Sequence, residues 1–295
     1  MSLFDQAVAR VLPAVPKPVV QLFSARYIAG QTLADAVRVV QRLNGEGKLA
    51  TVDVLGEEIT HEDDARAIAR AYIDVFRAIE RDDLAANVSV KLTALGLNLD
   101  YELCKENLES VVSQGKFVRI DMEDSSTTDD TLRLYRELRE AGYDNVGVVL
   151  QAYLRRTVDD IYALADLKPN VRLCKGIYVE PPALAFTDYE AVRANYVKAL
   201  QALATTASHV AIATHDEWLI EQALRALPPS YEFQMLLGVR EERASELVRE
   251  GHTLRVYVPF GEHWYRYSLR RLQENPAMAG TIARATVGRL FGRSQ

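Results

Sequence analysis

Residues 145–175 of the chain read NVGVVLQAYLRRTVDDIYALADLKPNVRLCK. Two short apolar runs rich in valine, residues 145–151 and 171–175, enclose a more polar, amphipathic segment at residues 157–164. Runs of this kind are typical of buried strands, and a helix is the usual connection between two parallel strands. The stretch therefore predicts a strand–helix–strand unit of an α/β fold.

The same alternation continues along most of the chain. Six more runs fit strands, at residues 49–54, 87–92, 117–122, 209–214, 231–236 and 254–258. Segments that fit helices lie between the runs, at residues 61–81, 131–141, 157–164, 183–203, 216–227 and 241–249. A series of strand–helix units without a long interruption favours a closed barrel over an open sheet, because closure leaves no unpaired strand edge. No G-x-G-x-x-G motif follows any of the runs, which argues against a dinucleotide-binding open sheet.

The chain is expected to divide into three parts. Its 295 residues fit one barrel with extra helices, since such barrels need about 250 residues. Before the first strand, a proline cluster and the helically spaced Val37, Val40 and Leu43 indicate helical segments. The expected parts are an N-terminal helical arm, the barrel and a basic C-terminal tail, at residues 1–47, 48–276 and 277–295.

Composition and charge narrow the class of protein. A hydrophobic fraction of 48% and a charged fraction of 26% are typical of a folded, soluble protein. The formal net charge of −6 provides no general positive field for nucleic acid. The two cysteines, Cys104 and Cys174, have no metal-ligand spacing, so we expect free thiols in a reducing compartment and no metal site. Without a recognisable signal peptide or apolar span, a cytoplasmic protein is predicted, at most peripheral on the inner face of the cell membrane.

Polar residues follow or end almost every expected strand. In barrel enzymes the active site lies at the carboxyl ends of the strands. A single charged residue there can simply mark the point where a strand meets solvent, but a nearly complete ring is costly to bury without a ligand. The ring predicts a polar ligand across the mouth of the barrel, and its members are Lys91, Asp121, Gln151, Arg172, Lys175, Thr214, His215, Glu232, Gln234 and Tyr257.

The segment after the last strand, GEHWYRYSLRRLQENP at residues 261–276, has two adjacent arginines. On a helix, Arg270 and Arg271 would point about 100° apart, close enough for both to meet one carboxylate above the barrel. Alternatively, this is a solvated helix face on which Arg270 pairs with Glu274 four residues later.

Several motifs together resemble one known family. In chain order they are SVKLTAL, RIDMED, QAYLRR, RLCKGIY, ATHD, YEFQMLLG, RVYVPFG and YSLRRLQENP, between residues 89 and 276. In this order they resemble the proline dehydrogenase family, and the resemblance extends over about residues 49–276. The chain lacks the DNA-binding and aldehyde dehydrogenase regions of bifunctional relatives, so it resembles the monofunctional bacterial type.

The resemblance implies a fold and an activity. The fold would be a distorted (β/α)8 TIM-type barrel that binds FAD noncovalently. The enzyme would oxidise L-proline to Δ1-pyrroline-5-carboxylate by hydride transfer to flavin N5, the first step of proline degradation to glutamate. Electrons would pass to a membrane quinone, and the implied partners include a pyrroline-5-carboxylate dehydrogenase.

The resemblance also assigns residues to roles. Asp121 and Arg172 match the family's catalytic positions, with Arg172 beside the flavin. The positions that match the site of the proline carboxylate are Lys91, Arg270 and Arg271, and further substrate-pocket positions are matched by Tyr178, Tyr257 and Glu274. The positions that match FAD contacts are Met122, Gln151, Arg172, Lys175, Gly176, Ile177, Thr214 and His215. Val179 stands where some relatives carry tryptophan.

Other functions are compatible with the same barrel. A Schiff-base lyase or aldolase would use Lys91 or Lys175 as nucleophile and would be colourless. A folate-reducing flavin barrel would be yellow but would respond to a nicotinamide donor. A barrel that only binds or scaffolds would leave the ring of strand-end charges without a use.

The C-terminal tail has two interpretations. It carries Arg284, Arg289 and Arg293 among apolar residues and has no acidic side chain. An amphipathic helix that touches a quinone-bearing membrane fits this pattern, and so does a solvated or subunit-contacting tail.

Overall fold

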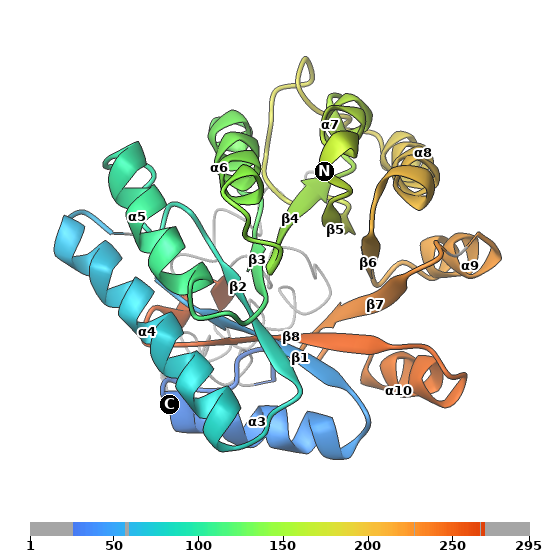
Figure 1. Cartoon of the computed structure of the whole chain (residues 1–295). Helices are drawn as coiled ribbons and strands as arrows, with labels where there is room; N and C mark the ends of the chain where they lie inside the picture. The colour runs from blue at the N-terminus through green and yellow to red at the C-terminus, as the bar shows by residue number, and fades with distance from the viewer. Residues whose placement is uncertain (1–25, 57–58, 227, 266, 269–295) are drawn as a thin grey trace, which may run out of the picture.

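The computed structural model describes residues 26–56, 59–226, 228–265 and 267–268. Parallel strands close into a barrel in which each strand pairs with its neighbours in sequence and β8 pairs with β1 (Figure 1). The strands are β1 Leu49–Val54, β2 Ala86–Val90, β3 Val118–Ile120, β4 Val146–Gln151, β5 Asn170–Cys174, β6 His209–Ala213, β7 Tyr231–Leu236 and β8 Leu254–Phe260. The predicted α/β fold, a (β/α)8 TIM-type barrel, is confirmed.

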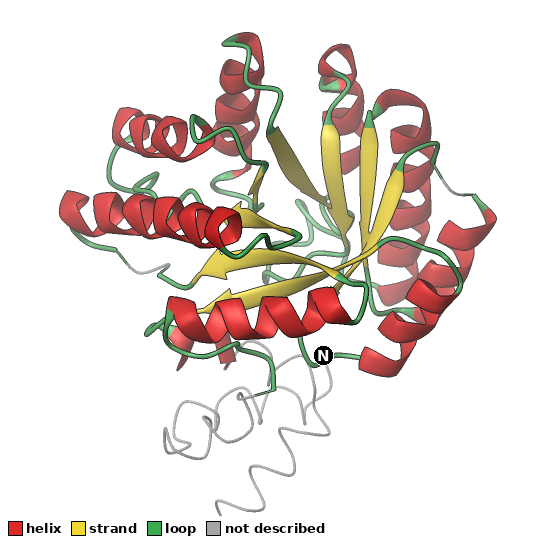
Figure 2. Ribbon diagram, turned by 60° about the horizontal axis from the view of Figure 1, so that its bottom comes forward, coloured by secondary structure: helices red, strands yellow, loops and turns green. Residues whose placement is uncertain are grey.

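Helices form an outer layer around the strands (Figure 2). They are α3 Leu33–Gly45, α4 Glu62–Arg81, α5 Tyr101–Val112, α6 Thr128–Glu140, α7 Thr157–Ala163, the short 3-10 helix η2 Ala165–Leu167, α8 Tyr189–Thr206, α9 Glu217–Arg225 and α10 Glu241–Arg249. In the part of the chain that the structure describes, no helix is both long and apolar enough to cross a membrane.

The two faces of several strands differ in polarity, and β2 illustrates this. Val88 and Val90 belong to the main hydrophobic core, whereas Ser89 lies between them on the opposite face. Arg172 on β5 donates a hydrogen bond to Ser89 across the barrel, so the Ser89 face points inward. The apolar core therefore lies between strands and helices, and the barrel interior is largely polar.

A buried arginine forms part of this interior below the mouth. Arg119 on β3 donates hydrogen bonds to the backbone oxygens of Val148 at 3.1 Å and Asn170 at 2.7 Å. Burial lowers the pKa of Arg119 to about 9. Gly147 on β4 makes room for it, because a Cβ there would lie 2.4 Å from Arg119 Nη1.

One helix boundary predicted from the sequence is wrong. The helix expected at residues 183–203 begins instead at Tyr189. Ala185 forms an antiparallel bridge with Leu154, so the chain is extended there, and the Asp188 side chain caps the helix by accepting from the Ala191 N–H. The residues after β5 therefore form a long loop over the β4 end of the barrel.

Helix α3 lies within the segment expected to be an N-terminal arm. A reciprocal capping box between Thr32 and Asp35 starts the helix. Its apolar residues Ala36, Val40 and Leu43 belong to the main core, and the helix packs against β1 and β8 (Figure 1). This helix thus covers the wall where the first and last strands meet.

Candidate active site

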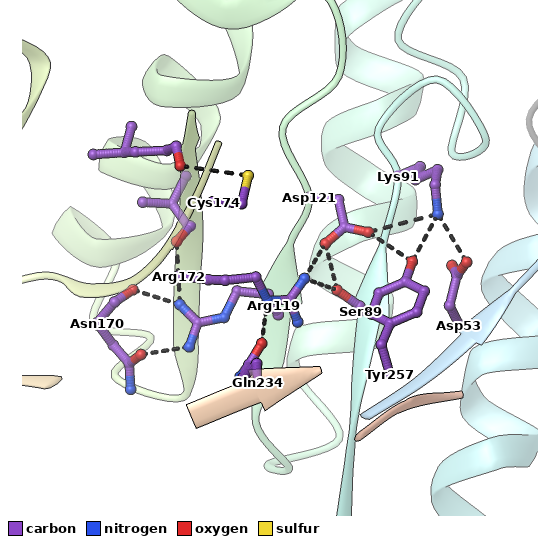
Figure 3. A network of polar contacts seen from close by, with 12 residues as sticks. Asp53, Ser89, Lys91, Arg119, Asp121, Asn170, Arg172, Cys174, Gln234 and Tyr257 are labelled. Carbon is purple, nitrogen blue, oxygen red and sulfur yellow. Dashed lines mark hydrogen bonds and ion pairs between the residues drawn. The ribbon is translucent and has the colours of Figure 1, made fainter. Parts of the chain in front are cut away.

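A network of buried polar side chains surrounds Asp121, at the carboxyl end of β3 (Figure 3). Its Oδ1 accepts hydrogen bonds from Ser89 Oγ at 2.5 Å and from Arg172 Nη1 at 2.6 Å. Its Oδ2 accepts from the Tyr257 hydroxyl at 2.9 Å and lies 3.5 Å from Lys91 Nζ. We call these side chains, with Asp53, the Asp121 network. The network brings together four residues that the sequence places in the site. They are Lys91 directly after β2, Asp121 directly after β3, Arg172 on β5 and Tyr257 on β8.

Asp53, on β1, joins the network as the partner of Lys91. Lys91 Nζ donates to Asp53 Oδ2 at 2.8 Å and to the Tyr257 hydroxyl at 3.0 Å. The Asp53 side chain is fully buried, and Tyr72 on α4 donates to its Oδ1 at 3.1 Å. The two carboxylates of the network therefore balance the two cations, Lys91 and Arg172.

Burial and charge act in opposite directions on the carboxyl groups of the network. Burial alone would raise the pKa of Asp121, but the charges of Arg172 and Lys91, with hydrogen bonds from Ser89 and Tyr257, hold it below its ordinary value. The pKa of Asp53 is raised by burial. The positive charge of Lys91 lowers this pKa and the negative charge of Asp121 raises it, and the net effect is an increase. Burial and Asp121 also raise the pKa of Tyr257 well above its ordinary value, so its hydroxyl stays protonated as a donor.

Arg172 is the member of the network with an unused donor. Its Nε donates to Gln234 Oε1 at 2.5 Å, and its Nη1 donates to Asp121 and, at 3.1 Å, to Ser89. Its buried Nη2 has no hydrogen-bond partner within the described residues. Leaving a charged donor buried and unpaired is costly, so this atom fits a site where a ligand supplies an acceptor.

A second cluster lies at the carboxyl ends of β5 and β6, around Asp216. The carboxylate accepts two hydrogen bonds from Arg193 on α8, at 2.9 and 2.7 Å. It also accepts from the Tyr189 hydroxyl at 2.6 Å and from Lys175 Nζ at 3.3 Å. Burial would raise the pKa of Asp216, but the bonds from Arg193 and Tyr189 and the charge of Lys175 hold it well below its usual range. We call these four side chains the Asp216 cluster.

Two expected cofactor residues frame this cluster. Thr214 Oγ1 accepts from the backbone N–H of Asp216 at 3.1 Å. His215 Nε2 accepts from the backbone N–H of Leu236 at 2.9 Å, so the imidazole is neutral with its proton on Nδ1.

The remaining expected cofactor residues lie on β4 and the loops after β3 and β5. Met122 is buried, and the buried Gln151 donates from Nε2 to the Glu123 backbone oxygen at 2.6 Å. Gly176 has φ +101°, and a Cβ there would lie 2.0 Å from the Tyr153 ring, so only glycine allows this turn. Ile177 is exposed.

Two other expected positions lie in the loop that follows β5. Tyr178 packs against the small cluster of Tyr153, Leu154 and Ala185. Val179 is 93% exposed, so nothing in the described chain covers the position where some relatives carry tryptophan.

The expected clamp of Arg270, Arg271 and Glu274 lies outside the described residues. Just before it, Tyr267 is buried with Tyr27, Ile28 and Leu55, and Trp264 packs against the same group. The chain therefore passes back over the β1 side of the barrel shortly before the two arginines.

Sequence reasoning missed several members of the site. Asp53 and Ser89 lie one residue before the ends of β1 and β2, and Arg193 lies on a helix. Ser89 could have been found from strand alternation, because it is two residues before Lys91 and shares its face. No local pattern marks Arg193, whose partner Asp216 lies far along the chain.

The fold and the Asp121 network together define a class of protein. A closed parallel barrel with a charged, buried cluster at the carboxyl ends of its strands is a TIM-barrel enzyme. The comparisons with known proteins narrow that class.

The chain belongs to the proline dehydrogenase family, whose members are oxidoreductases: the family model described as "Proline dehydrogenase" matches residues 36–284. It is 39% identical over 272 residues to Proline dehydrogenase 1 of Bacillus subtilis subsp. natto, covering 89% of this chain and 90% of that protein. It is 34% identical over 271 residues to the proline dehydrogenase of Deinococcus radiodurans, covering 87% of each. The resemblance to the monofunctional bacterial type is thereby confirmed.

A solved structure agrees with the fold. The crystal structure of proline utilization A (PutA) from Bdellovibrio bacteriovorus, inactivated by N-propargylglycine, matches with a TM-score of 0.79 and 25% identity. The match covers 93% of this chain but only 36% of that longer one.

Proposed function

We propose that this enzyme oxidises L-proline to Δ1-pyrroline-5-carboxylate with FAD as the electron acceptor. The observation that carries the proposal is the buried Nη2 of Arg172, which has no partner among the described residues and lies beside the charge-balanced Asp121 network. Family membership supplies the substrate class, and the polar strand ends supply groups for a large polar cofactor.

The residues around the mouth fit an FAD molecule. When bound, FAD would accept a hydride, that is, two electrons and a proton, from the substrate. The side chains and backbone that would hold it are those of Met122, Gln151, Arg172, Lys175, Gly176, Ile177, Thr214 and His215. Among them, Arg172 offers a donor without a partner in the described residues, and Lys175 shares one buried carboxylate, Asp216, with Arg193.

Charge balance bears on how the substrate carboxylate is bound. Asp53 and Asp121 already balance Lys91 and Arg172, so a carboxylate needs further positive charge. We propose that Arg270 and Arg271 supply this charge, that Lys91 contacts the same carboxylate, and that Tyr178, Tyr257 and Glu274 belong to the same pocket. In the alternative, a solvated Arg270–Glu274 pair, these side chains would not supply that charge.

Asp121 is better suited to hold charge than to accept a proton. Its lowered pKa keeps it ionised at neutral pH and makes it a weak base. In our proposal the proline nitrogen arrives neutral, a hydride leaves the ring carbon next to it, and the resulting iminium product releases its N–H proton to solvent. Asp121 and Arg172 are then the catalytic pair, with Asp121 orienting the cations and Arg172 placing positive charge where electrons arrive.

The later fate of electrons and product forms part of the proposal. Electrons pass to a membrane quinone, from a cytoplasmic enzyme that contacts the inner face of the membrane through its C-terminal tail. A separate pyrroline-5-carboxylate dehydrogenase receives the product. The tail lies outside the described residues.

An absorbance spectrum before and after anaerobic addition of L-proline tests the proposal. The purified protein is expected to show flavin bands that bleach with proline and persist with NADH. A colourless protein whose lysine is trapped by borohydride with a carbonyl substrate would instead indicate a Schiff-base enzyme. Bleaching by NADH alone would indicate a flavin enzyme of another family.

A further inference from the structure

A chain of hydrogen-bonded side chains, buried except for the half-buried Arg255, connects Arg172 to the wall of the barrel. Arg172 Nε donates to Gln234 Oε1, and Gln234 Nε2 donates to Glu232 Oε1, both at 2.5 Å. Glu232 in turn accepts two hydrogen bonds from Arg255, at 2.8 and 3.1 Å. Arg255 Nη1 donates to the backbone oxygen of Ala50 at 2.8 Å, which ties the chain to β1.

The contacts on both sides fix the direction of the Gln234 amide. An ionised carboxylate only accepts and a guanidinium only donates. Burial would raise the pKa of Glu232, but Arg255 and the bond from Gln234 hold it below its ordinary value, so Glu232 is an acceptor. The Gln234 NH2 group must therefore face Glu232, and its oxygen must face Arg172. A reversed amide would set donor against donor and acceptor against acceptor.

The amide also determines how Arg172 is oriented. With Nε bound to Gln234 and Nη1 bound to Asp121 and Ser89, the planar guanidinium is held at both ends. Without the Gln234 contact, the group could rotate about Nη1 toward a two-pronged pairing with Asp121, the geometry that arginine and carboxylate prefer. Such a rotation would redirect Nη2, the donor left without a partner in the described chain.

We infer that Gln234 is a positioning residue: its amide, set by the Glu232–Arg255 pair, holds Arg172 with Nη2 directed to the electron acceptor. The inference rests on the proposed function, because it requires a flavin as that acceptor. Gln234 acts through Arg172 and has no assigned contact with substrate.

Gln234→Leu is the primary test, because it removes the amide at nearly constant volume. The rate of flavin reduction by proline should fall about 10- to 100-fold, which is the loss of one charge-assisted hydrogen bond. The dissociation constant of tetrahydro-2-furoate, a carboxylate analogue without the reactive nitrogen, should stay within about twofold because the carboxylate contacts remain. The midpoint potential of the bound flavin, measured without proline, should become more negative because the nearby positive charge is less well placed.

Asn107→Leu is the matched control. Asn107 is another buried amide, and its Nδ2 donates to the Leu95 backbone oxygen at 3.0 Å, outside both clusters. It should lower the melting temperature without changing the reduction rate or the potential. If Gln234→Leu behaves like this control, Gln234 is structural only and the inference is overturned.

Gln234→Glu keeps the test decisive even if the leucine variant does not fold. Protonated, this glutamate can donate to Glu232 and accept from Arg172 as glutamine does, so the rate should be near wild type at low pH. Two adjacent carboxyl groups raise one pKa, and loss of the shared proton puts a second negative charge beside Arg172. The reduction rate should therefore fall as pH rises, in a step that the wild type lacks. A profile identical to wild type would overturn the inference, whereas a wild type without flavin would overturn the proposed function instead.

Discussion

Two aspartates at the mouth of the barrel have the same kinds of partner in different surroundings. Each is held by one arginine, one lysine and one tyrosine: Arg172, Lys91 and Tyr257 for Asp121, and Arg193, Lys175 and Tyr189 for Asp216. The two cations of the Asp121 network are 8% and 10% exposed, and those of the Asp216 cluster are 20% and 32% exposed. The same three types of partner are therefore shielded from solvent around Asp121 and partly exposed to solvent around Asp216.

The difference in charge balance is as informative as the difference in exposure. Asp53 makes the Asp121 network neutral. In the Asp216 cluster two cations share one buried carboxylate, and the second carboxylate near them, Glu190 beside Arg193, is exposed to solvent. Charges in a sealed site interact strongly with reacting atoms, because little water screens them. An open cationic cluster is better suited to hold an anionic group of a ligand. We therefore expect substitutions in the first to change rates and substitutions in the second to change cofactor affinity.

The largest expected effect on activity comes from Arg270 and Arg271, which belong to neither the Asp121 network nor the Asp216 cluster. If the Asp121 network is neutral, a buried carboxylate depends on Arg270 and Arg271, and each Arg→Met change should lower kcat/KM by about 30- to 1000-fold. FAD content and melting temperature should remain near wild type. Steady-state kinetics with inhibition by tetrahydro-2-furoate measures this. Unchanged affinity for the analogue in both variants would mean that the clamp assignment is wrong.

Arg172→Ala should slow flavin reduction by about 100-fold, in the range found when a preorganised electrostatic donor is removed. Binding of tetrahydro-2-furoate should change little, since the charge acts on the cofactor rather than on the carboxylate. Stopped-flow absorbance at several proline concentrations separates the rate of flavin reduction from the affinity for substrate. Arg136→Ala is a control, because Arg136 pairs with Asp166 on the outer surface. Equal losses of binding and reduction would assign Arg172 to the substrate.

Lys175→Met should sharpen the contrast between the clusters. Its ammonium is partly exposed, so its loss should weaken FAD binding by only about three- to tenfold. The reduction rate of enzyme saturated with FAD should equal that of wild type. Titration of apoenzyme with FAD measures the affinity. A slowed reduction at unchanged affinity would place Lys175 with the reacting groups.

The sequence predicts the barrel well because strand periodicity is a local property. Apolar runs bounded by polar segments locate all eight strands to within a few residues, and the carboxyl ends of strands locate Lys91, Asp121 and Arg172. Each of these signals depends on residues close together in the chain.

Hydrogen bonds between residues on different strands are harder to predict from the sequence. Asp53 is within a strand and matters only because Lys91, from the next strand–helix unit, reaches it. The direction of the Gln234 amide depends on Glu232 and Arg255 from two strands. The sequence pattern starts the helix before β6 at residue 183 instead of Tyr189, because the bridge of Ala185 to Leu154 is a tertiary contact.

A last expected effect is on stability and concerns Asp216 at acid pH. Its pKa in the folded protein lies below the ordinary 3.8, so the ionised carboxylate stabilises the fold above that pH. The contribution is lost as pH falls through the folded pKa. Asp216→Asn should therefore lower the free energy of unfolding at neutral pH, and the difference from wild type should shrink as pH falls below about 4.

Urea denaturation at a series of pH values measures this convergence. Asp159→Asn, which removes an exposed carboxylate on α7, controls for the change in net charge and should show no such convergence. A constant offset between Asp216→Asn and wild type at all pH values would mean that Asp216 contributes through packing and not through its charge. In that case the charge of Asp216 would add nothing to the stability of the fold. The Asp216 cluster would then differ from the Asp121 network in its exposure to solvent alone.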